Sequence, residues 1–136
     1  MNKKGKEPQG DKIKYEEEDF LNTKGVVYGI KCRLCDTEQK REKGNKIPMM
    51  YIGEIGRKIR ERITEHFTNY RDKNKRSEIF EHGEQKHGES DRKNWDFQII
   101  KKEGNKILRK MYESKEIANN ANLLNKSKGI TYIGKI

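Results

Sequence analysis

Apolar and polar positions along the chain divide it into strand-like and helix-like segments. Two runs rich in β-branched and aromatic residues, "GVVYGIKC" from Gly25 and "IPMMYIG" from Ile47, predict strands. A third run, "WDFQIIKKEGN" from Trp95, alternates apolar and polar residues and ends in a turn. Between the first two strands, residues 36–46 are polar and include a Gly-Asn turn motif, which predicts a long hairpin-like excursion.

Helical spacing of apolar residues appears in two places. After Gly56, which is expected to end the second strand, a first helix is predicted from Arg57 by the spacing of Ile59, Ile63, Phe67 and Tyr70. A second helix follows the third strand, and its apolar arc is expected to consist of Ile107, Met111, Ser114, Ala118 and Ala121. Residues 73–93 are polar and contain glycine, so we expect half loop and half short helix there.

Length and charge then set the domain organisation. Residues 1–20 show no sustained period and predict a flexible charged tail, and residues 21–136 are expected to form one domain around a single core. The formal charge is +10, but residues 1–20 hold five lysines against six acidic residues, so residues 21–136 carry about +11. Such a field attracts polyanions, most commonly nucleic acid and less often an anionic membrane surface. The alternative is that the lysines serve solubility alone.

The two cysteines, Cys32 and Cys35, lie in "KCRLCD". No stretch reaches the roughly 18 apolar residues of a membrane span, and the first ten residues lack the apolar core of a secretory signal. We therefore expect no membrane partner and an intracellular protein, nuclear if the source is eukaryotic. A reducing compartment argues against a structural disulfide, which leaves metal binding, redox work or coincidence.

An ordered set of short motifs resembles a GIY-YIG nuclease domain. It comprises "GVVY", "YIGEIGRKIRERITEH", "RKMYES" and "LLN", and it spans about residues 25–130. The resemblance implies an α+β fold with a small three-stranded antiparallel sheet flanked by helices, and hydrolysis of DNA phosphodiesters with one divalent metal ion. The second triplet, Tyr132-Ile133-Gly134, has two residues after it and no Arg-His helix, so we expect a terminal strand or extended tail there.

The residues that this reaction requires are present. Phosphodiester hydrolysis needs a cation at the phosphate, an activated water and stabilisation of the leaving oxygen. Tyr28 and Tyr51 lie on neighbouring predicted strands, where their hydroxyls could hold or deprotonate the water. The resemblance assigns the first tyrosine as the base.

Arg62 and His66 lie four residues apart and therefore share one face of the first predicted helix. Arg62 would clamp the phosphate with its planar guanidinium group, which lysine cannot reproduce. The alternatives are a solvated helix charge for Arg62 and a core or capping histidine for His66.

Glu113, in "RKMYES", resembles the family's metal-binding carboxylate. It lies at the flank of the predicted apolar arc, whereas Glu116 is expected to face solvent. One carboxylate with water and phosphate oxygens suits Mg²⁺, or Mn²⁺ in its place. Asn125, in "LLNK", matches a polar position that follows the glutamate in several families, although a turn asparagine is an equal alternative.

The cysteine pair narrows the resemblance to the endonuclease domains of Penelope-like retroelements, in which two cysteines and two histidines are proposed to bind zinc. Cys32 and Cys35 have ligand spacing, and His82 and His87 would complete four ligands, with His66 as an alternative ligand. This resemblance also implies a reverse transcriptase or other mobile-element partner.

The residues and this resemblance together predict a Mg²⁺-dependent DNA endonuclease that cuts or nicks DNA and leaves 5′-phosphate and 3′-hydroxyl ends. The nicking enzyme of a mobile element is one form of this prediction, and nicking and double-strand cutting both stay open. The alternatives are an inert, zinc-stabilised nucleic-acid-binding module and a mainly structural basic domain. The chain departs from the family pattern in having "GVVY" for Gly-Ile-Tyr and Ile55 where threonine is common.

Overall fold

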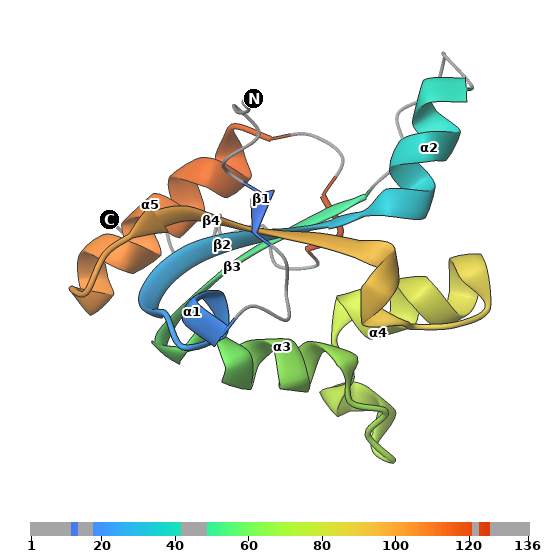
Figure 1. The fold of residues 1–136 in the computed structure, drawn as a ribbon, viewed down its shortest axis with the longest axis horizontal. Coiled ribbons are helices and arrows are strands. Elements are labelled where there is room, and N and C mark those ends of the chain that lie inside the picture. Colours follow the sequence, from blue (N-terminus) through green and yellow to red (C-terminus); the bar gives the residue numbers. More distant parts are fainter. Residues whose placement is uncertain (1–11, 14–17, 42–48, 121–122, 126–136) are drawn as a thin grey trace, which may run out of the picture.

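A mixed antiparallel-sheet and helix fold is seen in the computed structural model, which describes residues 12–13, 18–41, 49–120 and 123–125 (Figure 1). The sheet has the strand order β1-β4-β2-β3, and all neighbouring strands are antiparallel. Its three long strands are β2 (Lys24–Cys32), β3 (Met50–Lys58) and β4 (Trp95–Lys102), and the edge strand β1 covers only Lys12–Ile13. The predicted α+β class, with three long antiparallel strands, is confirmed.

Helices cover both faces of this sheet. Figure 1 shows α5 on one side and α1 and α3 on the other. The α-helices are α1 (Glu18–Leu21), α2 (Arg33–Arg41), α3 (Ile59–Phe67), α4 (Glu78–His82) and α5 (Lys106–Ala118). Short 3₁₀ turns, η3 (Lys73–Lys75) and η5 (Arg92–Asn94), and one π-helical turn, η4 (Gly83–His87), complete the described elements.

Strand β2 is buried on both of its faces. Successive side chains of a strand point to opposite sides, so Val26, Tyr28 and Ile30 enter the larger core cluster while Val27 enters a smaller one with Ile117 of α5. This two-sided burial explains the continuous apolar run that predicted the strand.

Three expectations for the first half of the chain are wrong. Part of the expected polar excursion is the helix α2, because its Glu, Gln, Lys and Arg residues favour helix. Strand β3 does not stop at Gly56 but continues to Lys58. The glycine instead leaves room for the guanidinium group of Arg109, whose nearest nitrogen lies 2.9 Å from the position that a Cβ atom would take. Helix α3 ends at Phe67, before Tyr70.

The predicted apolar arc of α5 is wrong except at Ser114, which is buried; Ala118 is exposed, and Ala121 lies outside the described residues. The side chains of Ile107 and Met111 are 65% and 41% exposed, and the residues that α5 buries are Arg109, Ser114 and Ile117. The helix is rotated because Arg109 is buried in an ion pair, which a hydrophobic period cannot indicate.

The N-terminal boundary is corrected as well. Phe20 is 2% exposed and packs on Phe97, and Lys12–Ile13 pair with β4, so these residues belong to the folded domain and not to the expected tail of residues 1–20. The second triplet, Tyr132-Ile133-Gly134, lies outside the described residues. Among the described helices, none is long and apolar enough for a membrane crossing.

Candidate functional site

A cavity of about 380 Å³ lies beside β3 and is lined from both helical layers of the molecule. It brings together five of the residues predicted to act in catalysis: Tyr28, Tyr51, Arg62, His66 and Glu113. These residues come from β2, β3, α3 and α5, so the fold converges four separate segments on one place. Its other lining residues are Gly53, Glu54, Glu65, Lys75, Arg76, Ser77, Glu78 and Lys110.

Tyr28 lies over the glycine of the first Tyr-Ile-Gly triplet. Tyr28 and Gly53 are directly paired across β2 and β3, and the Tyr28 hydroxyl occupies the space that a Cβ atom on Gly53 would need. Burial, with a contribution from Tyr51, raises the pKa of Tyr28 well above its usual value. Burial and then the nearby Glu78 carboxylate raise the pKa of Tyr51 to about 12. Both phenols are therefore neutral at pH 7.

His66 is held between two hydroxyl groups. Its Nε2 lies 2.8 Å from the Tyr28 hydroxyl, and its Nδ1 lies 2.6 Å from Oγ of Ser77. Ser77 is the N-cap of α4, and its Oγ also accepts the N–H of Ile79. Burial, with a smaller effect of Arg62, lowers the pKa of His66 to about 3, so the imidazole is neutral and can both donate and accept.

Arg62 is fixed at the cavity by two acceptors. Its guanidinium group donates to Oε1 of Glu65 at 2.8 Å and to the carbonyl oxygen of Glu54 at 3.3 Å. Its side chain is 31% exposed, so it is not the fully solvated helix charge that was the alternative. With five N–H donors in the group, others stay available to a ligand in the cavity.

Glu113 and Glu116, three residues apart on α5, occupy different positions. Glu113 lines the cavity, and burial, followed by repulsion from Glu54, raises its pKa to about 7. Glu116 does not line the cavity and is partly buried, which corrects the expectation that it is fully solvated.

Asn125 is not brought to the cavity. Its side-chain amide accepts the N–H of Ile52 at 3.1 Å and donates to the carbonyl oxygen of Ile52 at 2.7 Å. It thus pairs with β3 as a backbone group would, and beside it Leu124 donates its N–H to the carbonyl of Met50. In this structure Asn125 closes the edge of the sheet.

Among the polar cavity residues that sequence reasoning missed are Glu54, Lys110 and Ser77. Glu54 and Lys110 are ion-paired across 56 residues of sequence, and Ser77 contacts His66 across 11. The only sequence feature that pointed toward Ser77 is its position before the short helical run "EIFEH", a typical N-cap position. Nothing local in the sequence pairs Glu54 with Lys110.

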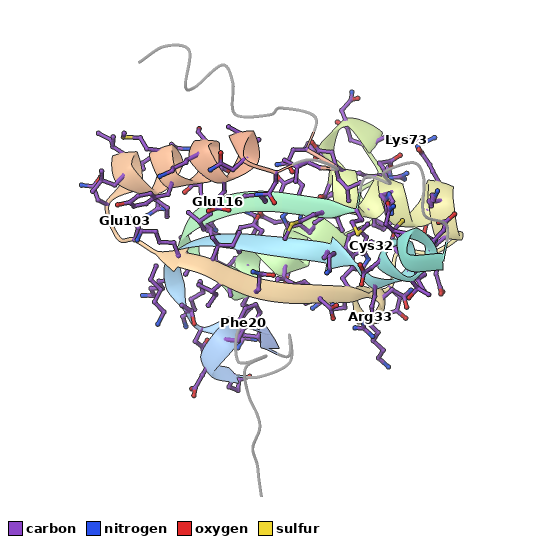
Figure 2. All side chains as sticks on the ribbon, turned by 90° about the horizontal axis from the view of Figure 1, so that it is seen from above. Phe20, Cys32, Arg33, Lys73, Glu103 and Glu116 are labelled. Atoms are coloured by element: carbon purple, nitrogen blue, oxygen red, sulfur yellow. The ribbon has the colours of Figure 1, made fainter. Side chains whose placement is uncertain are left out.

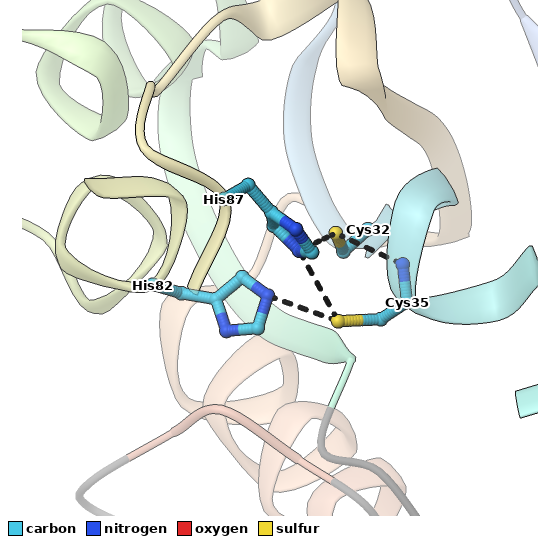
Figure 3. Close-up of side chains that lie close together, drawn as sticks. All are labelled: Cys32, Cys35, His82 and His87. Carbon is cyan, nitrogen blue, oxygen red and sulfur yellow. Dashed lines mark hydrogen bonds between the residues drawn. The ribbon is translucent and has the colours of Figure 1, made fainter. Parts of the chain in front are cut away.

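A second group of side chains lies apart from the cavity (Figure 3). Cys32 ends β2, Cys35 lies in the first turn of α2, and His82 and His87 end α4 and η4. Their four ligand atoms all lie within 4.8 Å of one another, so this group could hold a metal ion. His66, the alternative ligand, is not part of the group, because its ring is held in the cavity.

The π-helical turn makes the two histidines neighbours. Five residues of α-helix would set their side chains about 140° apart around the axis. The wider η4 turn, which has i→i+5 hydrogen bonds, changes this phase, and the two imidazole rings lie 5.2 Å apart. The turn ends at Gly88, whose φ of 80° is left-handed.

Distances and protonation in this group fit a tetrahedral metal ion. Three sulfur-to-nitrogen separations, from Cys32 to His87 and from Cys35 to both histidines, are 3.3 Å, close to the separation of about 3.5 Å around tetrahedral zinc. Burial, and then the charge of His87, lowers the pKa of His82 to about 4, so it is neutral as a ligand must be. Burial and then Cys32 raise the pKa of Cys35 to about 12, so a thiolate there requires a cation.

Comparison with known proteins adds no assignment. No protein family model, no curated protein and no solved structure matches the chain. The cavity and the Cys₂His₂ group are therefore the basis on which a function is assigned.

The close approach of Tyr28 to Gly53 generates a prediction about stability. In Gly53→Ala the new methyl group must displace the Tyr28 hydroxyl and its contact with His66, so we expect a loss of about 1–3 kcal/mol in the free energy of unfolding. Urea unfolding followed by circular dichroism measures it.

Gly104→Ala is the matched control, because no atom lies within 4 Å of its Cβ position and its φ is not left-handed. We expect it to be neutral or slightly stabilising. Equal stability of the two variants would contradict the packing described here.

Proposed function

We propose that the protein is a Mg²⁺-dependent DNA endonuclease of the GIY-YIG type. The observation that carries this proposal is the cavity in which Tyr28, Tyr51, Arg62, His66 and Glu113 meet. A module that only binds nucleic acid does not need the buried phenols of two tyrosines and the buried imidazole of a histidine beside a carboxylate and a guanidinium group.

The residues divide the work of hydrolysis. Tyr28, hydrogen-bonded to His66, orients the attacking water and accepts its proton as the phenol passes its own proton to the imidazole. Tyr51 lies beside the same imidazole and orients the water. Arg62 holds the non-bridging phosphate oxygens with the donors that Glu65 does not use. The products are a 5′-phosphate and a 3′-hydroxyl.

Glu113 is the carboxylate that would hold Mg²⁺ or Mn²⁺, together with water and phosphate oxygens. The bound ion supplies charge stabilisation for the leaving oxygen. Glu113 and Arg62 both line the cavity, and they come from α5 and α3, the helices on opposite faces of the sheet (Figure 1).

We further propose that Cys32, Cys35, His82 and His87 bind a structural Zn²⁺. The sulfur-to-nitrogen separations and the neutral His82 support this assignment. The ion would join the end of β2 to α2, α4 and η4. Such a centre, together with the motif order, favours the Penelope-like branch of the family. We then expect a reverse transcriptase or other mobile-element protein as partner. The site of action would be intracellular, and nuclear in a eukaryote.

The second candidate is a zinc-stabilised nucleic-acid-binding module that does not cut. The charge of about +11 in residues 21–136 and the Cys₂His₂ group favour it, and neither requires catalysis. A nicking assay separates the two candidates.

The nuclease proposal predicts cleavage that depends on Glu113. The parent protein should convert supercoiled plasmid to nicked circles with Mg²⁺ and not with EDTA. Glu113→Gln and Arg62→Ala should each lower the cleavage rate on the order of 10² or more, because each removes one electrostatic group from the transition state. Gel-resolved time courses at saturating protein measure the rate.

Glu116→Gln is the matched control on the same helix and should cut at the parental rate, because Glu116 does not line the cavity. If Glu116→Gln is inactive while Glu113→Gln cuts normally, the assigned carboxylate is wrong. If all variants and the parent fail to cut with Mg²⁺ or Mn²⁺, the binding module is the better assignment.

Binding to DNA should depend steeply on salt. With six or so phosphate contacts, affinity for a duplex is expected to fall about 10³-fold or more between roughly 50 and 200 mM salt. Fluorescence anisotropy of a labelled duplex in EDTA measures binding without cleavage. A flat response would show that the basic surface does not bind the DNA backbone.

Zinc should copurify with the protein at about one ion per chain. Cys35→Ser should lose that zinc and lower the midpoint of thermal unfolding, because metal binding contributes to folding. Elemental analysis and thiol titration of protein purified without added metal measure both.

His66→Gln is the control for zinc content, and we expect it to keep the ion because His66 lies in the cavity. Loss of zinc in this variant would restore His66 as a ligand. Parent protein without zinc and with freely reactive thiols would refute the metal centre.

A further inference from the structure

A buried ionic triad adjoins the cavity, and the reaction described above does not use it. Glu54 of β3 accepts a hydrogen bond from Nε of Arg109 at 2.6 Å and another from Nζ of Lys110 at 3.0 Å. The side chains of Arg109 and Glu54 are 7% and 12% exposed, and that of Lys110 is 34% exposed. Burial alone would raise the pKa of Glu54, but these two hydrogen bonds hold it below its usual value, so the group is ionised.

The triad needs an explanation other than stability. Withdrawing charges from water costs several kcal/mol per ion, and buried ion pairs are often no more stabilising than apolar residues of the same volume. Two cations share one carboxylate here, so the triad carries a net charge of +1. The sequence places that excess charge beside a site assigned to an anionic substrate.

Within the triad, Arg109 and Lys110 have different roles. Arg109 also donates to the carbonyl oxygens of Glu103 and Gly104, at 3.1 and 3.2 Å, and is thereby tied to the turn before α5. Lys110 lines the cavity, and its ammonium group has three donors, of which Glu54 accepts one. Arg109 therefore fixes Glu54, and Glu54 fixes the ammonium group of Lys110.

The other cavity-lining cations differ from Lys110 in their assigned role, their pairing or their exposure. Arg62 is paired with Glu65, and Arg76 donates to the carbonyl of Tyr70 and lies 3.6 Å from Glu81. Lys75 is exposed at the rim. Lys110 is thus a partly buried cation whose position is set by a rigid partner and whose charge is not fully compensated.

We propose that Lys110 forms a second phosphate-binding position in the cavity, held in place by Glu54 and Arg109. This inference rests on the proposed nucleic-acid substrate. Lys110 contacts a backbone phosphate oxygen of the bound strand from the α5 side, while Arg62 contacts phosphate from the α3 side. Lys110 also lies one helical turn before Glu113, so its contact places the phosphate next to that carboxylate.

The test compares Lys110→Met with Lys115→Met, an exposed lysine of the same helix outside the cavity. Two quantities are measured on the full chain: the salt dependence of duplex affinity in EDTA, and the plasmid nicking rate with Mg²⁺. Lys110→Met should reduce the slope of log K against log salt by about 0.9, the value for one phosphate contact, and should lower the nicking rate at least tenfold. Lys115→Met should match the parent in nicking rate.

Lys110→Arg keeps the charge and should restore most of the affinity and the parental slope. Thermal unfolding checks that each variant is folded, and Lys110→Gln replaces Lys110→Met if the latter is not. A folded Lys110 variant with parental slope and parental nicking rate overturns the proposal.

Failure of the nuclease proposal can be distinguished from failure of the Lys110 proposal. If the parent binds duplex but does not cut, the nuclease assignment fails, and the salt slope alone decides for or against Lys110. If the parent neither cuts nor binds duplex, the phosphate position falls together with the proposed function.

Discussion

Burial of β2 on both faces is the constraint on which the rest of the molecule depends. The strand pairs with β3 on one side and β4 on the other, and its side chains enter both core clusters. Because 40% of the residues are charged, few apolar side chains are available to form a core, and β2 holds several of them in one segment. The strand also contributes a residue to each candidate site, because Tyr28 lies at its middle and Cys32 at its end.

The layers on either side of the sheet explain why the cavity is polar. Helix α3 brings Arg62 and His66 to one face, and α5 brings Lys110 and Glu113 from the other, so charged groups meet beside β3, away from the central strand. Figure 2, seen from above, shows side chains on both sides of the sheet, and the labelled residues include Glu116 of α5 and Cys32 of the Cys₂His₂ group. The charged residues of the cavity are thus gathered at one edge of the sheet.

Much of the fold was predictable from the sequence because local patterns decide it. The three long strands follow from β-branched and aromatic runs, and α3 follows from the spacing of Ile59 and Ile63. The phase of α5 could not be predicted, because the residue that fixes it, Arg109, is buried by a partner 55 residues away. Helix α2 was missed because residues 36–41 are all polar and, of its described side chains, only Cys35 is fully buried, and β1 was missed because two residues are too few for any pattern.

The residues of the two candidate sites also differ in whether a local sequence pattern could predict them. Residues within motifs, such as Arg62 and His66, could be placed from spacing on one helix, and the cysteine pair gave its own spacing. Asn125 was expected to act in the reaction, yet its amide is used by the backbone of Ile52, a contact that depends on how the chain returns to β3. The contact of Ser77 with His66 could not be read from its N-cap position, and Glu54 had no local signal at all, because its partners Arg109 and Lys110 are more than 50 residues away.

Helix α4 has a consequence that concerns both sites at once. Ser77, at its N-terminus, contacts the imidazole of His66, and His82, at its C-terminus, belongs to the Cys₂His₂ group. The five residues of this helix span only about 7.5 Å along its axis, and a helix this short moves as one rigid unit. The helix therefore links the Cys₂His₂ group rigidly to the cavity, so a displacement of His82 is passed to Ser77 and from Ser77 to the imidazole of His66. A change in the Cys₂His₂ group therefore bears on the position of His66 as well, although no residue of that group lines the cavity.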